Sequence, residues 1–232
     1  MMSNLVTDII SLPLSHKYKI KKLIYVGSSC MYPKNIKNNA SPNIILSSSL
    51  EETNLHYATS KITGMILCDA FNKQFGTNFI TVIPSNYFGP NDDFSKENSH
   101  VIPALINKIH KAKKKNKKII KVWGSGKPIR DFLYVEDMIK ALIFLMKNYR
   151  STKPINISSN HIYSIKEITY LLKQIIGYDG KVKFDITKPD GTYFKSLDNS
   201  KVKKLGWKHS FTFKESLELT YKWYLGTKIN KL

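Results

Sequence analysis

The sequence predicts an α/β protein with a mostly parallel, doubly wound sheet. Apolar runs of strand length alternate with longer helical segments along the 232 residues, an order typical of parallel sheets with helical connections. The runs that begin at Lys22 and Phe79 are apolar at nearly every position, as expected for strands that are buried on both faces. Small or polar residues follow both runs, and ligands bind at the carboxyl ends of strands in such sheets.

The elements are expected in the following order along the chain. Helices are expected at about residues 1–19, 54–75, 101–113, 135–147, 164–176 and 213–225. Strands are expected at about residues 22–29, 79–83, 119–123, 155–158 and 182–184. Ser164 and Glu167 have the spacing of a capping box, and Gly76 and Gly177 stand where helices should end. Residues 33–53 are rich in Asn, Ser and Pro and are expected to form a long surface loop.

Composition favours a protein of the reducing cytoplasm. The net charge of +20 is compatible with nucleic-acid binding, but lysine is abundant throughout. We therefore interpret the lysine-rich run at 111–118 as a solvated helix end and loop, and consider nucleic acid an unlikely partner. The sequence shows no apolar run of about 18 residues and no basic start of a signal peptide, so no membrane contact is expected. Two cysteines, Cys30 and Cys68, do not form a disulfide framework.

Tyr57 and Lys61 lie four residues apart in the helix expected at 54–75, and side chains at this spacing share one helix face. An ammonium beside a phenol lowers the tyrosine pKa from its reference value of about 10. We therefore expect Tyr57 to donate or accept a proton at a carbonyl or hydroxyl group. The pair alone is common on amphipathic helices, so its meaning depends on the segments around it.

Several segments in a fixed order give this pair a context. They are Gly27-Ser28-Ser29-Cys30-Met31-Tyr32-Pro33, Tyr57-x-x-x-Lys61, Pro84-Ser85-Asn86, Asn98-Ser99-His100-Val101-Ile102-Pro103-Ala104-Leu105, Trp123-Gly124-Ser125-Gly126, Arg130-Asp131-Phe132 and Lys188-Pro189-Asp190-Gly191-Thr192. Together they resemble the GDP-L-fucose synthase family of the extended short-chain dehydrogenase/reductase (NAD-dependent epimerase/dehydratase) superfamily. The likeness covers nearly all of this chain and corresponds to the later part of a family member.

The resemblance implies a 3,5-epimerase and NADPH-dependent 4-reductase that converts GDP-4-keto-6-deoxy-D-mannose to GDP-L-fucose. Cys30 and His100 match the acid/base pair that removes and returns protons beside the ketone. Tyr57 would supply the proton for reduction, Ser28 would hydrogen-bond the reacting oxygen, and Lys61 would hold the nicotinamide ribose.

The same resemblance assigns the binding residues. The implied catalytic set is Tyr57, Lys61, Ser28, Cys30 and His100. The residues implied to bind NADP(H) are Val26, Gly27, Ser28, Ser29, Tyr57, Lys61, Pro84, Ser85, Asn86, Tyr87 and His100. The residues implied to bind the GDP-linked sugar are Lys108, Trp123, Arg130, Asp190 and Lys195. No metal is implied. Lys108 stands where the family usually has arginine, so the charge is kept but the planar fork is lost.

The resemblance also implies a Rossmann-like fold that lacks its first βαβ part and carries a small C-terminal α/β substrate lobe. We expect residues 1–95 to form the later part of the cofactor domain, with strands added by later segments, and residues 96–232 to form mainly the lobe. No G-x-G-x-x-G or G-x-x-G-x-x-G turn occurs. A homodimer through the helix bearing Tyr57 and its neighbour is implied.

Three other interpretations stay open. The chain could be a truncated or split homologue that binds only the nucleotide sugar, or one that needs a companion chain to supply the missing part. It could be another nucleotide-sugar epimerase or dehydratase, since Tyr57 and Lys61 are shared across the superfamily. The charge also leaves a nucleic-acid binder as a hypothesis from a different class.

Overall fold

The computed structural model describes residues 1–95 and 99–229, so Asn98 of the predicted site segment lies outside the described residues. Its first sheet is parallel throughout and has the order β1-β2-β6. These strands are β1 (Leu23–Val26), β2 (Phe79–Pro84) and β6 (Ile155–Ile157). Val82 on the central strand lies opposite Val26 on one side and Ile155 on the other. The predicted parallel α/β fold is confirmed.

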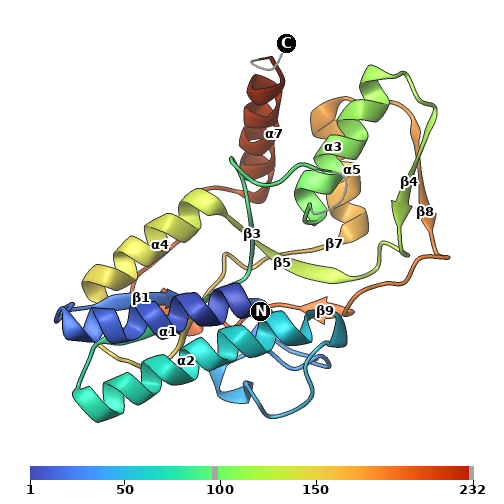
Figure 1. Ribbon diagram of the computed structural model, residues 1–232. Coiled ribbons are helices and arrows are strands. Elements are labelled where there is room, and N and C mark those ends of the chain that lie inside the picture. The colour runs from blue at the N-terminus through green and yellow to red at the C-terminus, as the bar shows by residue number, and fades with distance from the viewer. Residues whose placement is uncertain (96–98, 230–232) are drawn as a thin grey trace.

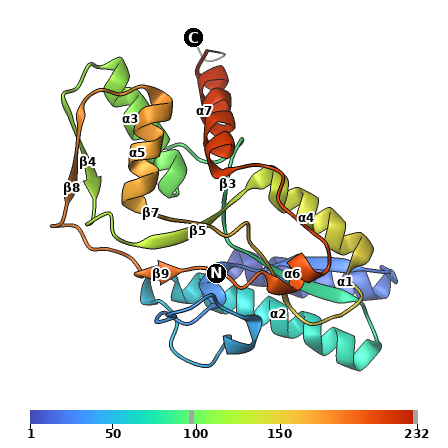
Figure 2. The ribbon, with the colours of Figure 1, turned by 180° about the vertical axis from the view of Figure 1, so that it is seen from behind.

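Helices cover both faces of this sheet, as the continuous apolar character of β2 requires (Figures 1 and 2). The helices concerned are α1 (Met2–Lys17), α2 (Leu55–Phe75) and α4 (Val135–Asn148). Phe79 and Ile83 pack on the side of α1 and α2, whereas Ile80 and Val82 pack on α4. Side chains that alternate along a strand therefore enter two different cores, which makes the sheet doubly wound.

The remaining strands and three further helices form a second part around a separate apolar core. Its mixed sheet consists of β3 (Asn86–Phe88), β5 (Ile129–Tyr134), β7 (His161–Ser164) and β9 (Phe194–Lys195). A two-stranded parallel ribbon consists of β4 (Ile119–Trp123) and β8 (Lys181–Asp185). The helices are α3 (Val101–Lys114), α5 (Ile165–Ile176) and α7 (Phe213–Ile229), and they share one hydrophobic cluster with β4 and β5. Strand β5 runs between the ribbon and the first sheet (Figure 1).

Most of the predicted elements lie where the sequence placed them. The capping box at Ser164 is present: Ser164 accepts from the Glu167 main chain, and Glu167 accepts from that of Ser164. Gly76 and Gly177 end α2 and α5 with φ of 64° and 67°, in the left-handed region that favours glycine. No described helix has the length and apolar character needed to span a membrane.

Short elements were not predicted. These are strands β3, β5, β7 and β9, helix α6 (Ser200–Lys204) and the single 3-10 turns η1 (Ser29–Met31), η2 (Pro42–Ile44) and η3 (Glu52–Asn54). Strand β5 was missed because it carries Arg130 and Asp131, which break its apolar pattern. The carboxylate of Asp131 is buried but accepts hydrogen bonds from Ser158 and from the main chain of Leu197. Contacts from distant segments thus allow a charged residue inside a strand.

Candidate active site

Two predicted cofactor loops meet where β1 and β2 end. The main-chain N–H of Gly27 donates to the carbonyl oxygen of Val82 at 2.8 Å, which holds the first loop against the second strand. In the second loop, the N–H of Ser85 donates to Ile157 at 2.9 Å, and the side chain of Asn86 donates to the carbonyl of Asp131 at 3.2 Å. Both loops are therefore fixed at the carboxyl edge of the sheet, where ligands of such folds bind.

A tight turn presents Cys30 at this edge. The N–H of Cys30 donates to the Ser28 hydroxyl at 3.2 Å, and the N–H of Ser28 donates to the Met31 sulfur at 3.3 Å. A Cβ atom on Gly27 would come within 2.9 Å of the same sulfur. A side chain at position 27 would therefore displace Met31, and this explains the glycine before the turn.

Tyr57 joins this group from helix α2. Its phenol is hydrogen-bonded to Ser28 and lies close to Cys30 and Tyr87. Burial raises the pKa of Tyr57 above its usual value, and the Ser28 hydrogen bond acts in the opposite direction. The structure therefore brings Ser28, Cys30 and Tyr57 together, as the sequence predicted.

Lys61 is engaged differently from the sequence-based expectation. Its ammonium donates to the carbonyl oxygen of Val26 at 3.0 Å and lies 5.0 Å from the ring centre of Tyr25. The ammonium is not among the groups that shift the pKa of Tyr57, which is raised. The expectation that Lys61 lowers this pKa is thus wrong for this arrangement, because the ammonium is held at the end of β1.

Two cations from the second part of the chain approach Cys30. The ammonium of Lys195 lies 3.9 Å from the Cys30 sulfur and 3.7 Å from a carboxylate oxygen of Glu51. Arg130 interacts electrostatically with Cys30, Glu51 and Asp190. Burial lowers the pKa of Arg130, and the nearby acids act in the opposite direction. Predicted substrate residues and a predicted catalytic residue thus share one region.

Asp190 holds a loop beside this region. Its carboxylate accepts hydrogen bonds from the main chain and the hydroxyl of Ser125, at 2.8 and 2.6 Å, and these bonds lower its pKa. Gly124 has a φ of 79°, and a Cβ atom there would come within 2.3 Å of the carboxylate. Asp190 therefore fastens its loop to the turn after β4, next to Trp123.

Lys108 and Trp123 lie on a hollow of about 830 Å³ between α3 and β4. The indole of Trp123 is 70% exposed, and the ammoniums of Lys108 and Lys188 lie 5.9 and 5.8 Å from its ring. Lys108 also donates to the carbonyl of Lys121 at 2.9 Å, and burial lowers its pKa. An exposed aromatic face flanked by cations suits a base and its phosphates.

His100 lies at the start of helix α3, where it is the N-cap residue and is exposed. Asp92 is the charged group that interacts with it. Within the described ranges, no hydrogen bond joins His100 to Ser28, Cys30 or Tyr57. The sequence-based pairing of His100 with Cys30 therefore stays a prediction.

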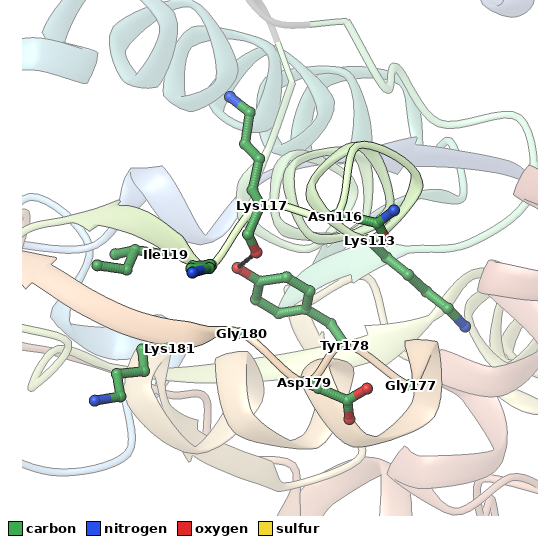
Figure 3. Close-up of a pocket in the computed structure, with 10 residues that line it drawn as sticks. Lys113, Asn116, Lys117, Ile119, Gly177, Tyr178, Asp179, Gly180 and Lys181 are labelled. Carbon is green, nitrogen blue, oxygen red and sulfur yellow. Dashed lines mark hydrogen bonds between the residues drawn. The ribbon is translucent and has the colours of Figure 1, made fainter.

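A second hollow, of about 640 Å³, has none of the predicted site residues in its lining (Figure 3). Four lysines line it, and three of them, Lys113, Lys117 and Lys181, point in different directions in the close-up. Lys113 caps helix α5 by donating to the carbonyl of Ile176 at 2.6 Å, and Tyr178 donates to the carbonyl of Lys117 at 2.8 Å. The polar groups here serve the local packing and do not converge on one point.

Sequence reasoning misses two acidic residues of the site. Asp131 belongs to the segment Arg130-Asp131-Phe132, but no role was expected for it. The one hint in the sequence is that its carboxylate directly precedes the apolar residues Phe132 and Leu133. No sequence pattern predicts that Glu51 contacts Thr192 and Lys195, because these two residues come from the distant C-terminal segment.

The family model described as the NAD dependent epimerase/dehydratase family matches residues 1–164, which is more than half of the chain. The chain belongs to this family. Relatives within the epimerase/dehydratase family include a protein named probable GDP-L-fucose synthase 1 from Oryza sativa subsp. japonica, 44% identical over 211 residues. That match covers 91% of this chain and 64% of the rice protein.

Solved structures show the same fold. A GDP-L-fucose synthetase from Naegleria fowleri bound to NADP superimposes with a TM-score of 0.92 at 30% identity, covering 97% of this chain and 73% of that one. A GDP-6-OMe-4-keto-L-xylo-heptose reductase from C. jejuni gives a TM-score of 0.90 at 32% identity, covering 97% and 76%. The chain spans about two thirds of the length of the curated relatives it matches.

Proposed function

We propose that this chain carries out GDP-L-fucose synthase chemistry: 3,5-epimerisation of GDP-4-keto-6-deoxy-D-mannose and NADPH-dependent reduction of its C4 ketone to give GDP-L-fucose. The observation that carries the proposal is the gathering of Ser28, Cys30 and Tyr57 at the carboxyl end of β1. A hydroxyl, a thiol and a phenol at the same edge of the sheet provide hydrogen-bond and proton-transfer groups for a ketone and its neighbouring carbons.

The residues at the ends of β1 and β2 fit the nicotinamide end of NADP(H). Gly27 leaves the approach free of a side chain, and the loops at Gly27 and Ser85 are held by main-chain hydrogen bonds. The hydrogen bond from Lys61 to the carbonyl oxygen of Val26 holds the lysine at the same edge of the sheet. NADPH supplies the hydride when it is bound. The 232 residues contain no glycine-rich turn for the pyrophosphate, so the residues named here account for the nicotinamide end of the cofactor.

Proton transfer would then use the chain's own side chains. Tyr57 donates a proton to the ketone oxygen during reduction, and its hydrogen bond to Ser28 orients the phenol. Cys30 and His100 remove and return protons on the carbons beside the ketone, which are acidified by it. Arg130, Lys195 and Lys108 bind the diphosphate side of the substrate, with Trp123 at its nucleoside end.

A second candidate is a GDP-4-keto-sugar C4 reductase that does not epimerise. It is favoured by the likeness to the C. jejuni heptose reductase. The two candidates share NADPH, the GDP-linked sugar and Tyr57. They differ in whether protons beside the ketone exchange with solvent.

We also propose a homodimer and a cytoplasmic location. Helix α1 has an exposed apolar stripe of Val6, Ile9 and Ile10 next to α2, which suits packing against a second copy. A reactive thiol at Cys30 requires a reducing compartment. Light scattering tests the dimer, and an Ile9→Glu variant is expected to be a monomer.

The test of the proposed function is NADPH binding by the purified chain, followed by fluorescence, and NADPH oxidation on addition of the 4-keto sugar. Lys61→Ala should weaken binding, whereas Lys73→Ala, on the exposed face of the same helix, should not. Oxidation without the sugar's consumption, or no oxidation at all, would contradict the proposal. Binding of GDP without NADPH would instead support the homologue that binds only the nucleotide sugar.

A further inference from the structure

Glu51, which the sequence did not assign to the site, lies among its positive charges. One carboxylate oxygen accepts a hydrogen bond from Thr192 at 2.8 Å and lies 3.7 Å from the ammonium of Lys195. The other oxygen accepts from Thr53 at 3.2 Å. The carboxylate thus ties the segment before helix α2 to the segment around β9.

This ion pair is mostly hidden from solvent. The side chains of Glu51 and Lys195 are 18% and 11% exposed. Burial acts to raise the pKa of Glu51, but the Thr192 hydrogen bond and the Lys195 charge outweigh it and hold the pKa below the usual value. A pair that is buried and braced by hydrogen bonds keeps its geometry, unlike an exposed pair of long side chains.

The held ammonium faces the sulfur of Cys30 at 3.9 Å. A neighbouring cation favours the thiolate form of a cysteine, which is the form that accepts a proton. Cys68, the other cysteine, lies at 1% exposure inside the α1–α2 core and has no lysine or arginine among the groups that influence it. The two thiols therefore differ in both access and surroundings.

We propose that Glu51 and Lys195 form a positioning pair for Cys30: Glu51 fixes the Lys195 ammonium against the sulfur, and the ammonium stabilises the thiolate. In the reaction, the thiolate sulfur takes a proton from a carbon beside the ketone and becomes a thiol. The C–H electron pair forms a double bond to the carbonyl carbon, and the C=O π pair moves onto the oxygen to give an enolate. The catalytic use of this thiolate rests on the proposed function, but the contact does not.

The test is the rate at which iodoacetamide alkylates Cys30 in the intact chain, located by mass spectrometry. Lys195→Met should slow the reaction about three- to tenfold, because the thiolate loses its neighbouring cation. Lys195→Arg should restore most of the rate, since it keeps the charge. Lys188→Met, which removes an ammonium beside Trp123 and not beside Cys30, is the matched control and should react at the native rate.

Glu51→Gln separates anchoring from a direct charge effect. If Glu51 acts by holding Lys195, its substitution should slow alkylation in the native chain and leave the rate unchanged in the Lys195→Met chain. Equal changes in both chains, or a native rate for Lys195→Met, would overturn the proposal. Circular dichroism establishes that each variant is folded, and Lys195→Gln replaces Lys195→Met if the latter unfolds.

Alkylation requires neither NADPH nor sugar, so it is independent of the proposed activity. A chain without turnover that still shows the expected alkylation pattern would contradict the proposed function and leave the positioning pair standing. A chain with turnover whose alkylation rate does not depend on Lys195 would contradict the positioning pair and leave the proposed function standing.

Discussion

The two ends of the proposed site are built in different ways. At one end, Ser28, Cys30 and Tyr57 are held by hydrogen bonds within a turn and against helix α2. At the other, Trp123 is 70% exposed, and two lysines lie near its ring without hydrogen bonds to it. The first arrangement fixes atoms for chemistry, whereas the second offers a surface on which a base can stack. Substitutions at the two ends should therefore affect different kinetic constants.

The largest effect is expected for Tyr57→Phe. Removal of the phenolic proton donor should lower kcat for NADPH oxidation by about 10²- to 10⁴-fold, the usual contribution of general acid catalysis. NADPH affinity, measured by fluorescence, should stay at the native value because the ring remains in place. Tyr18→Phe, an exposed tyrosine at the end of α1, is the control and should retain full activity. A Tyr57→Phe chain with native kcat would contradict the role of Tyr57 as the proton donor.

Asp131 tests the contacts that hold strand β5 against the segments around Ser158 and Leu197. Burial raises its pKa to about 6, partly opposed by hydrogen bonds from Ser158, Leu197 and Ser196. This is above the pKa of about 4 of an exposed aspartate, so the folded chain binds more protons between these values and the Asp131 contribution to stability falls as the pH rises through them.

The Asp131→Asn variant should not lose stability in this way as the pH rises. Between about pH 4 and about pH 7, its free energy of unfolding should fall less than that of the native chain, by about 3 kcal/mol. Denaturant titrations at the two pH values measure the difference. Asp179→Asn, outside the site, should behave as the native chain does. An identical pH dependence for Asp131→Asn would contradict a raised pKa at Asp131.

At the exposed end, Trp123→Ala should raise KM for the nucleotide sugar about tenfold, because a stacked base contributes about 1–3 kcal/mol. The kcat for NADPH oxidation should change little, since Trp123 does not contact the Cys30 group. Tyr18→Ala removes a ring of comparable exposure far from the hollow and should leave both constants unchanged. A fall in kcat with an unchanged KM would contradict the claim that the two ends of the site affect different kinetic constants.

The smallest effect is expected for Lys108→Arg. A guanidinium binds phosphate oxygens in pairs, so KM should fall about two- to threefold without a change in kcat. Lys114→Arg, on the same helix but not among the residues that line the hollow, should have no effect on either constant. A rise in KM would indicate that the hydrogen bond from Lys108 to the carbonyl of Lys121 matters more than contact with phosphate.

Local patterns in the sequence predicted much of this arrangement. Helical spacing placed Tyr57 and Lys61 on one face, and Gly76 and Gly177 marked helix ends because only glycine readily adopts their positive φ. What the sequence missed depends on contacts between distant segments. In strand β5, one carboxylate oxygen of the buried Asp131 accepts hydrogen bonds from the distant residues Ser158 and Leu197, which no local pattern could predict.

The role of single lysines shows the same limit. Helical spacing placed Lys61 on the same face of helix α2 as Tyr57. It could not predict the hydrogen-bond partner of Lys61, which is the carbonyl of Val26 at the end of strand β1. Lys195 was assigned to substrate from the resemblance, while its pairing with Glu51 and its approach to Cys30 follow only from the folded chain. Periodicity predicts which residues share a surface, and tertiary packing decides which atoms meet.

The most direct measurement is product analysis after the chain is incubated with GDP-4-keto-6-deoxy-D-mannose and NADPH in deuterated water. The account predicts GDP-L-fucose that carries deuterium at C3 and C5, because both carbons exchange their protons before the ketone is reduced. A reduced product without deuterium would identify a C4 reductase that does not epimerise. Recovery of the unchanged keto sugar would contradict the central claim that this chain brings proton transfer and reduction into one site.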